Sequence, residues 1–580
     1  MNRRFYILTS ISFLCCLLIF TFYPSLRSSS EAYASSTQAS RGERNSVFNA
    51  YDKKGALATM LCDPNMIEPT LVSIYSLNAA FAKKPSSKAD IIVLIPESIR
   101  VEQQDIHRLE KLGAHVIRTA FPQSTLDDKS NACNSLINLW ALFDYQKIVY
   151  FSPDVVFDKN VDQLFNYPPG SALSLNDDQD TPLFVLAPNP STFEGLIRDC
   201  SKALASSSSF AELLQDSYFD YKLRIPPKEI KENVHVYSAP MKPWNFHAYS
   251  DIDWKKHYDP VGFYKWRRVN NDVRRLLDPS ATKDWVNEPR QQIVCDSYLQ
   301  SVANASYFPI HDQFSVMIST YNPERIEHLS LIIRHLLKSD KVHTVFITWH
   351  NPALDVPASL YQDIPEKDYE RVKVLGQTFD SLNNRFNPVD ELKTDAVYIM
   401  DDDIYVDLKD LEFTFSVWRS RKDSVVGHFP RVHTYDPLTK DATYKLIQKA
   451  PYSIILTKSM FIRSDYLFSY TCLLEPKLHQ LVDNQLNCED LGFSMMTSGM
   501  SNAASTFVRP RKHMEDFGLK QGISTNTAHM PARADCISDF ITQFWNAKDP
   551  LVNSYDIAAP FAKPLIRVGD WERIERTILG

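Results

Sequence analysis

The feature that most constrains the fold of this chain is an alternation of short apolar runs with stretches of helical periodicity, which occurs twice. In the first half, DIIVLIP and KIVYF are such apolar runs. The second half begins again at Phe314, with FSVMIST, RIEHLSLIIRHLL, VHTVFITW, VKVLG and AVYIM in that order. Strands that alternate with helices form parallel sheets with crossover helices. The sequence therefore predicts two α/β domains of Rossmann-like type, at 53–260 and 312–548, with a charged, irregular linker at 261–311.

The N-terminus is typical of a membrane anchor. Residues 5–23 carry no charge over 19 residues, which is enough for a helix to span a bilayer core of about 30 Å. Arg3 and Arg4 precede this run, so the positive-inside rule predicts a cytoplasmic tail at 1–4 and a luminal remainder. An aromatic edge at 22–24 favours an uncleaved anchor over a signal peptide cleaved at 32–34.

The remaining segments and the bulk composition fit a luminal protein. Residues 24–52 are polar and Ser-rich, as expected of a flexible stem, and Asn304 begins an N-glycosylation pattern. Two of the nine cysteines lie in the anchor, which leaves an odd seven for disulfides in an oxidising lumen. The net charge of −7 and the lack of a basic run exclude an ordinary nucleic-acid binder. Nothing in the tail at 549–580 indicates its role.

Three consecutive carboxylates, at Asp401, Asp402 and Asp403, follow directly on the apolar run AVYIM. At about 4 Å, each like-charge pair costs on the order of 4 kcal/mol at an effective dielectric constant near 20, so a cationic partner is expected. In open α/β sheets, ligands bind outside the carboxyl ends of the strands. Carboxylate oxygens suit Mg²⁺ or Mn²⁺, and these ions suit a diphosphate. The alternative interpretation is an acidic surface turn.

Further motifs give the second half a specific resemblance. They are SLNNRF at 381–386, TDAVYIMDDD, FTFSVWRSRKDSVVGHFPR, the Asn-Cys-Glu-Asp motif at 487–490, and Arg533 shortly before Cys536. In order and spacing, this half resembles the exostosin C-terminal domain, glycosyltransferase family 64. The resemblance implies a GT-A fold, a nucleotide-sugar donor, a divalent metal ion, and transfer with retention of the anomeric configuration.

The resemblance also implies roles at the donor site. Asp403 would be the direct metal ligand, while Asp401 and Asp402 would hold the ribose or orient the waters of the metal ion. The metal ion would act as a Lewis acid on the leaving diphosphate and would offset the repulsion among the three carboxylates. Four further residues are expected to contact the donor: Arg325, Asn351, Asn384 and Arg385.

Two residues match the family's catalytic positions. Asp490 would lie beneath the sugar, where it would stabilise an oxocarbenium-like transition state or act as a nucleophile; the sequence leaves both open. The alternative is a carboxylate that only favours a helix N-terminus. Arg533 would stabilise the leaving phosphates. The same resemblance implies a disulfide between Cys488 and Cys536 that joins both segments.

The first half resembles glycosyltransferase family 8, the glycogenin-like class, through residues 136–165 and the Lys-Pro-Trp motif at 242–244. That family holds its metal ion with two aspartates and a histidine. Here Ser152 takes the first aspartate position, Asp154 remains, and the histidine position falls on Val236, one residue from His235. A slip of one residue along a strand points the side chain to the opposite face. This half is therefore predicted to be inactive, with a role in packing, acceptor capture or partner binding.

Together these patterns predict a type II membrane protein of the Golgi or endoplasmic reticulum. It would use Mn²⁺ or Mg²⁺ to move N-acetylhexosamine from UDP-GlcNAc or UDP-GalNAc to a glycan, glycolipid or glycoprotein, alone or in an oligomer with itself or other transferases. A GDP-mannose or other hexose donor, for glycolipid acceptors, is the main alternative. A polymerase with two active halves and a non-catalytic scaffold for another transferase are the remaining hypotheses. Ser152 argues against the former, and the charged residues at 401–403, 490 and 533 argue against the latter.

Overall fold

The computed structural model describes twelve stretches of the chain: residues 55–82, 89–119, 136–174, 182–203, 222–224, 226, 228–248, 251–279, 286–301, 308–446, 450–519 and 529–560. The predicted cytoplasmic tail, anchor, stem and Asn304 lie outside these residues. Within them, no helix is both long enough and apolar enough to cross a membrane. The chain divides into two compact units, which are Met1–Trp244 with Lys265–Lys283, and Asn245–Tyr264 with Asp284–Gly580.

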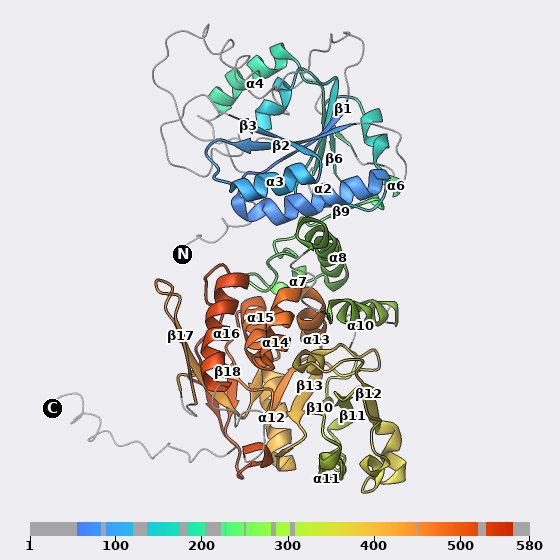
Figure 1. Ribbon diagram of the computed structural model, residues 1–580, viewed down its shortest axis with the longest axis vertical. Coiled ribbons are helices and arrows are strands. Elements are labelled where there is room, and N and C mark those ends of the chain that lie inside the picture. Colours follow the sequence, from blue (N-terminus) through green and yellow to red (C-terminus); the bar gives the residue numbers. More distant parts are fainter. Residues whose placement is uncertain are drawn as a thin grey trace, which may run out of the picture. The chain divides into compact units, whose positions relative to one another are not determined.

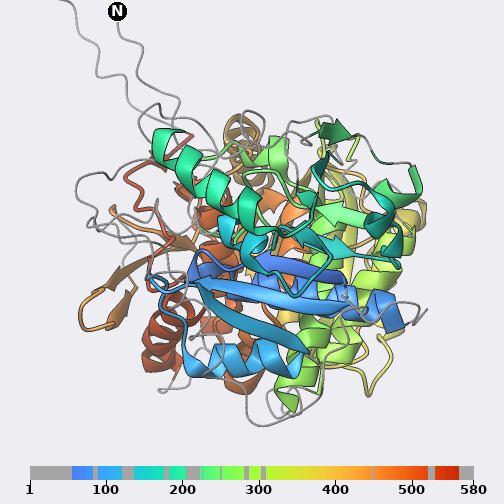
Figure 2. The same ribbon diagram turned by 90° about the horizontal axis from the view of Figure 1, so that it is seen from above.

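Unit 1 is built on a mixed seven-stranded sheet in the order β3-β2-β1-β4-β7-β6-β8. The first four strands are parallel, and β7 joins β4 antiparallel. Helix α4 lies on one side of the sheet and α2 and α3 on the other (Figure 1), and Figure 2 shows α3 and α4 on opposite sides. The elements are η1 (Pro64–Met66), η3 (Asp162–Asn166), α2 (Ile67–Ala82), α3 (Gln103–Lys111), α4 (Pro190–Ala203), α6 (Lys228–Lys231), β1 (Gly55–Met60), β2 (Asp90–Pro96), β3 (Ala114–Thr119), β4 (Lys147–Phe151), β5 (Val155–Phe157), β6 (Ser171–Leu173), β7 (Leu183–Leu186), β8 (Lys222–Arg224) and β9 (Val234–Val236).

Unit 2 contains an eight-stranded sheet in the order β12-β11-β10-β13-β19-β15-β20-β22. Strands β10 to β13 are parallel, as the alternation of strands and helices predicts, and β19 joins β13 antiparallel. The strands are β10 (Phe314–Thr320), β11 (Val342–Trp349), β12 (Val372–Gly376), β13 (Ala396–Asp401), β14 (Ile404–Tyr405), β15 (Val426–Gly427), β16 (Pro430–Tyr435), β17 (Ala442–Lys445), β18 (Ile454–Ile455), β19 (Ser459–Arg463), β20 (Thr506–Val508), β21 (Glu515–Asp516) and β22 (Ile557–Ala558).

Unit 2 also contains α-helices and shorter helical turns. The α-helices are α7 (Trp254–His257), α10 (Glu288–Ser301), α11 (Ile326–Leu336), α12 (Leu408–Ser420), α13 (Asp465–Phe468), α14 (Pro476–Gln485), α15 (Glu489–Ser501) and α16 (His529–Phe544). The shorter turns are η4 (Pro323–Arg325), η5 (Ala358–Tyr361), η6 (Glu366–Arg371), η7 (Leu382–Phe386), η8 (Ser469–Leu473) and η9 (Phe517–Leu519).

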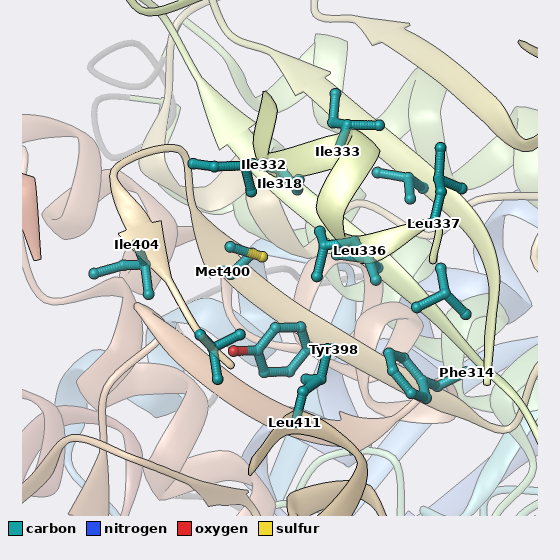
Figure 3. Packing of buried hydrophobic residues seen from close by; sticks show 14 of the residues in the cluster. Phe314, Ile318, Ile332, Ile333, Leu336, Leu337, Tyr398, Met400, Ile404 and Leu411 are labelled. Atoms are coloured by element: carbon teal, nitrogen blue, oxygen red, sulfur yellow. The ribbon is translucent and has the colours of Figure 1, made fainter. Parts of the chain in front are cut away.

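The core of unit 2 lies between the parallel strands and their helices. Strand β10 is buried at every residue but one, because both faces of a parallel sheet are covered. Side chains of α11, such as Ile333 and Leu336, lie over the strand residues Phe314, Tyr398 and Met400 (Figure 3). Burying side chains of this size contributes roughly 1.5–3 kcal/mol each. This packing fixes the strand ends that carry the polar residues described below.

Two of the predicted boundaries differ from the structure. The expected irregular linker contains α8 (Pro260–Leu277) and α10. Helix α8 alternates buried aromatic residues such as Phe263 and Trp266 with charged ones, a helical pattern that its high charge obscures. The expected C-terminal tail contains β22, which pairs with β20 through Phe507 and Ile557. A two-residue strand is too short to show a periodicity in the sequence.

Candidate active site

The aspartate cluster lies where the central strands of unit 2 end. Asp401 is the last residue of β13 and pairs with Ser319 of β10. Asp402 is buried, and its Oδ2 accepts a hydrogen bond of 2.7 Å from the Thr320 hydroxyl at the end of β10. Its Oδ1 accepts a second one, also 2.7 Å long, from Nη1 of Arg325. The parallel strands thus bring these polar groups to one edge of the sheet, as predicted.

Asp403 is the least satisfied member of the cluster. Its Oδ2 accepts a 3.0 Å hydrogen bond from the same Nη1 of Arg325. Its Oδ1 is buried and has no hydrogen-bond partner among the described residues. Burial, followed by the neighbouring charges of Asp401 and Asp402, raises the pKa of Asp403 to about 6. An unpartnered buried carboxylate oxygen of this kind would be stabilised by a cation.

A glycine lies next to the Asp403 carboxylate and leaves space beside it. Strand β14, just after the cluster, pairs with β21, and the backbone N–H of Phe517 donates to the carbonyl oxygen of Asp403 at 3.0 Å. This brings Gly518 against the carboxylate, so that a Cβ atom at this position would lie 2.4 Å from Asp403 Oδ2. The space beside the carboxylate therefore depends on a residue with no side chain.

These residues fit a divalent ion that is held by one protein carboxylate. The fit rests on the unpartnered Oδ1 of Asp403 and on the space that Gly518 leaves. In the described part of the chain, no group of three or more His, Cys, Asp or Glu residues is arranged to hold a metal ion. Mg²⁺ is commonly bound by one or two carboxylates, with substrate phosphates and water as the other ligands. Asp403 fits that pattern.

The third aspartate has its own arginine. Nη1 of Arg385 donates to Asp401 Oδ1 at 3.1 Å and to the Thr457 hydroxyl at 2.6 Å. The same atom lies 3.6 Å from a carboxylate oxygen of Glu489. Burial raises the pKa of the Glu489 carboxyl. Arg385 and Arg325 are thus two of the cations that offset the repulsion among the three aspartates in this structure.

Asp490 and Arg533 form a buried pair on two different helices. Nη2 of Arg533, in α16, donates to Asp490 Oδ2 at 2.5 Å, and Nη1 donates to Asn487 Oδ1 at 3.0 Å. Both members are at most 5% exposed. The predicted disulfide between Cys488 and Cys536 is confirmed, and it joins the segments that carry the pair. Asp490 also lies at the start of α15, as the alternative interpretation requires, but its contact with Arg533 goes beyond that role.

The two halves of the site are connected through charge. Arg385 lies between Asp401 and Glu489, and Glu489 is the sequence neighbour of Asp490. The charge of Asp490 also raises the pKa of Arg385, after the larger contributions of Glu489 and Asp401. The structure therefore brings the aspartate cluster and the Asp490–Arg533 pair into one continuous network.

Two of the residues expected at the donor site have their side chains bonded within the protein. The amide of Asn384 donates to the carbonyl oxygen of Phe379 at 2.7 Å, and this side chain is 1% exposed. Asn351 Oδ1 accepts from the backbone N–H of Ala353 at 3.1 Å. Donor contact by these two residues stays a prediction.

The sequence did not point to several other residues of this network. Lys458 contributes an attractive charge near Asp403 and pairs with Asp516 at 2.9 Å. The ring of Tyr444 lies 4.5 Å from the Arg533 guanidinium. Thr457 and Gly518 also belong here. All of these contacts join distant parts of the chain, and no local motif marks them. A second disulfide, Cys295–Cys472, was likewise unpredicted, because an odd cysteine count does not specify pairings.

In unit 1, the remaining aspartate is already bound to a cation of the protein. Nζ of Lys242 lies 2.6 Å from Asp154 Oδ2. Strand β5 pairs with β9 so that Val155 faces Val236 and Val156 faces His235. The His235 ring packs against Tyr237 with centroids 4.5 Å apart. Asp154, the aspartate that remained as a candidate metal ligand, is thus ion-paired with Lys242, and the inactivity of this half stays a prediction.

Comparison with known proteins identifies the family of unit 2. The family model described as Glycosyl transferase family 64 domain matches residues 314–561. Glycosyltransferase family protein 64 C3 of Arabidopsis thaliana is 32% identical over 265 residues, which cover 42% of this chain and 79% of the relative. The chain belongs to glycosyltransferase family 64. The resemblance noted for the second half is thereby confirmed, whereas the family 8 resemblance of the first half stays a prediction.

This family 64 chain is also similar to proteins with more specific names. Exostosin-2 of Homo sapiens is 29% identical over 252 residues, which cover 42% of this chain and 34% of that protein. Glycosylinositol phosphorylceramide mannosyl transferase 1 of Arabidopsis thaliana is 28% identical over 253 residues, covering 41% of this chain and 74% of the relative. Among solved structures, the glycosyltransferase GlyE of Streptococcus pneumoniae has a TM-score of 0.27 and 14% identity, over 57% of this chain and 81% of that one. A score this low carries no conclusion. Family membership makes the chain a glycosyltransferase.

Proposed function

We propose that unit 2 is a GT-A type, retaining, metal-dependent glycosyltransferase that moves N-acetylhexosamine from a UDP-sugar to a glycan, glycolipid or glycoprotein. The observation that carries this proposal is the unpartnered Oδ1 of Asp403, which belongs to the same charged network as the buried pair of Asp490 and Arg533. With the predicted anchor at 5–23, the enzyme would act as a type II membrane protein in the lumen of the Golgi or endoplasmic reticulum.

At the donor end, the aspartates and the arginines have different roles. A divalent ion held by Asp403 would supply Lewis acidity to the leaving diphosphate. Arg325 is one-third exposed at its side chain, so its guanidinium can reach a phosphate from its place beside Asp402 and Asp403. Arg385 is buried and holds Asp401 in place. These residues bind and orient the donor, while the protein's own cations keep the carboxylates in position.

At the sugar end, Asp490 and Arg533 act on the bond that breaks. The Asp490 carboxylate would stabilise positive charge at the anomeric carbon or attack it, and retention is compatible with both routes. The Nε of Arg533 is buried and unpartnered among the described residues, so it is available to donate to an oxygen of the leaving phosphate. Because this N–H group is already desolvated and held in place, it interacts strongly with the negative charge that develops on the leaving phosphate.

Unit 1 has a supporting role in this proposal. The Asp154 carboxylate is neutralised by Lys242, so this unit would pack, capture acceptors or bind a partner rather than transfer a sugar. Assembly with itself or with other transferases is compatible with such a role.

GDP-mannose is the second candidate donor. It is favoured by the similarity to a relative named as a mannosyl transferase of glycosylinositol phosphorylceramide. A site made of a metal ion and arginines reads the diphosphate and not the base, so it accommodates either nucleotide. The acceptor in that case would be a glycolipid.

The test is a donor assay on the full chain purified in detergent. UDP- and GDP-sugars would be supplied with and without Mn²⁺, and donor hydrolysis and transfer to glycan or glycolipid acceptors would be measured. Asp403→Ala should abolish turnover, whereas Asp154→Ala should leave it unchanged. If only GDP-mannose is turned over, the second candidate donor is correct and the UDP-sugar is not. Activity that survives Asp403→Ala, or equal loss in both variants, would contradict the proposal.

A further inference from the structure

Tyr444 forms one wall of the Asp490–Arg533 pair. It lies on β17, at the edge of the β16–β17 hairpin, which runs beside α16 (Figure 1). The Cζ of Arg533 lies over the Tyr444 ring, 4.5 Å from its centroid. A guanidinium within about 6 Å of an aromatic face is attracted to it, and more strongly where water is excluded. Arg533 is 5% exposed, so the contact is of the desolvated kind.

The hairpin that carries Tyr444 is fixed to the rest of unit 2 at two places. Across the strand pair, Tyr444 faces His433. The His433 ring is buried and bonds through Nδ1 to the Ser453 hydroxyl at 2.6 Å and through Nε2 to Asp549 at 2.8 Å. At the turn, the hydroxyl of Ser538 in α16 donates to a backbone carbonyl of the hairpin at 2.5 Å. Tyr444 is therefore held rigidly against the helix that carries Arg533.

The contacts of Arg533 leave one part of its guanidinium for a ligand. Nη1 is bonded to Asn487 and Nη2 to Asp490, while Nε is buried without a partner among the described residues. The two hydrogen bonds alone still allow the plane to tilt. The contact with the Tyr444 ring restricts this freedom, because a tilt of the guanidinium would weaken its attraction to the ring face. The direction of the Nε–H bond is then set by Tyr444.

We infer that Tyr444 is a positioning residue for sugar transfer. Its ring keeps the Arg533 guanidinium in the plane that maintains the hydrogen bond to Asp490 and aims Nε at the leaving phosphate. This inference rests on the proposed function of Arg533. The inference assigns this role to the aromatic ring. Phenylalanine at position 444 should therefore preserve the activity, whereas an aliphatic side chain should not.

The experiment compares Tyr444→Leu, Tyr444→Phe and Thr443→Val in the full chain. Thr443 is the neighbouring residue on the same strand, it is exposed, and its side chain points to the opposite face. We expect Tyr444→Leu to lower kcat about tenfold to thirtyfold, with KM for the donor changed less than threefold. Tyr444→Phe and Thr443→Val should keep kcat within about threefold, and thermal unfolding should show all three variants folded.

A crystal structure of Tyr444→Leu provides a measurement that does not depend on turnover. We expect the Arg533 guanidinium to have rotated away from Asp490 in this variant and to be unmoved in Tyr444→Phe. The inference is overturned if Arg533 keeps its place in Tyr444→Leu, or if Tyr444→Phe loses as much kcat as Tyr444→Leu. If the wild-type chain turns over no donor, the proposed function of unit 2 fails. The structure still decides whether Tyr444 positions Arg533.

Discussion

The raised pKa of Asp403 predicts that the carboxylate proposed to bind the metal ion lowers the stability of the metal-free protein. The pKa of this carboxyl is about 6 in the folded chain, against an ordinary value of 3.8. A difference of about 2 units corresponds to about 3 kcal/mol. Its side chain is 12% exposed, so solvent screens little of this effect. The ionised carboxylate therefore destabilises the metal-free protein by up to roughly that amount.

The sign of the pH dependence follows from where the protons are bound. Between pH 3.8 and 6 the folded chain holds a proton on Asp403 that the unfolded chain has released. The free energy of unfolding therefore falls as the pH rises through this window, and the loss is complete above about pH 7. Asparagine at this position carries no such charge. Asp403→Asn should thus gain stability relative to wild type as the pH rises from 4 to 7.

Thermal unfolding of both proteins in EDTA, at intervals from pH 4 to 8, measures this gain. We expect the difference in Tm to grow by roughly 5 °C across the range. Asp312→Asn, at an exposed carboxylate, is the matched control and should show no such trend. Adding Mn²⁺ and UDP at pH 7.5 should raise the Tm of the wild type and not that of Asp403→Asn, because only the former binds the ion. A difference in Tm that is constant with pH would refute the reasoning.

Three further predictions concern the residues around the cluster. Gly518→Ala should weaken binding of UDP with Mn²⁺ more than tenfold by calorimetry, with Tm nearly unchanged, because the added Cβ displaces the flexible Asp403 carboxylate; unchanged affinity would contradict this. Thr320→Val should cost about 1–3 kcal/mol in urea unfolding, since it removes a hydrogen bond from the buried carboxylate of Asp402; a neutral effect would show that water replaces the hydroxyl. Cys488→Ser opens a cross-link that spans 48 residues and should lower the free energy of unfolding by about 4 kcal/mol, with loss of activity; equal stability under oxidising conditions would argue against the bond.

The sequence predicted those parts of unit 2 that have a strong local pattern. The apolar runs FSVMIST, VHTVFITW, VKVLG and AVYIM all form parallel strands. The signature is most continuous in β10 and β13, which are buried on both faces. Asp401, Asp402 and Asp403 could be placed at the sheet edge, because a strand end fixes the position of the residues that follow it. The disulfide between Cys488 and Cys536 came from a family resemblance and not from spacing.

The remaining parts could not be predicted, because they depend on contacts between distant segments. The pairing of β14 with β21 brings Gly518 to Asp403, but each strand has only two residues and neither has a detectable period. Two of the cations that offset the aspartate repulsion are Arg325, on the 3₁₀ turn after β10, and Arg385, on the 3₁₀ turn after β12. Tyr444 reaches Arg533 only through the hairpin. Such contacts follow from the tertiary fold and leave no mark in a single sequence.

The bond between Cys488 and Cys536 has a consequence for where the enzyme can mature. Asp490 and Arg533 lie on separate helices, and the covalent link stands directly beside both of them. A freshly translated chain in a reducing environment would have its sheet but not this cross-link, so the Asp490–Arg533 pair would be fixed only after a thiol oxidase or disulfide exchange had acted. Under the proposed function, catalytic competence would be acquired as a late step of oxidative maturation. Expression in the bacterial cytoplasm should accordingly yield folded but inactive protein, and oxidative refolding should activate it.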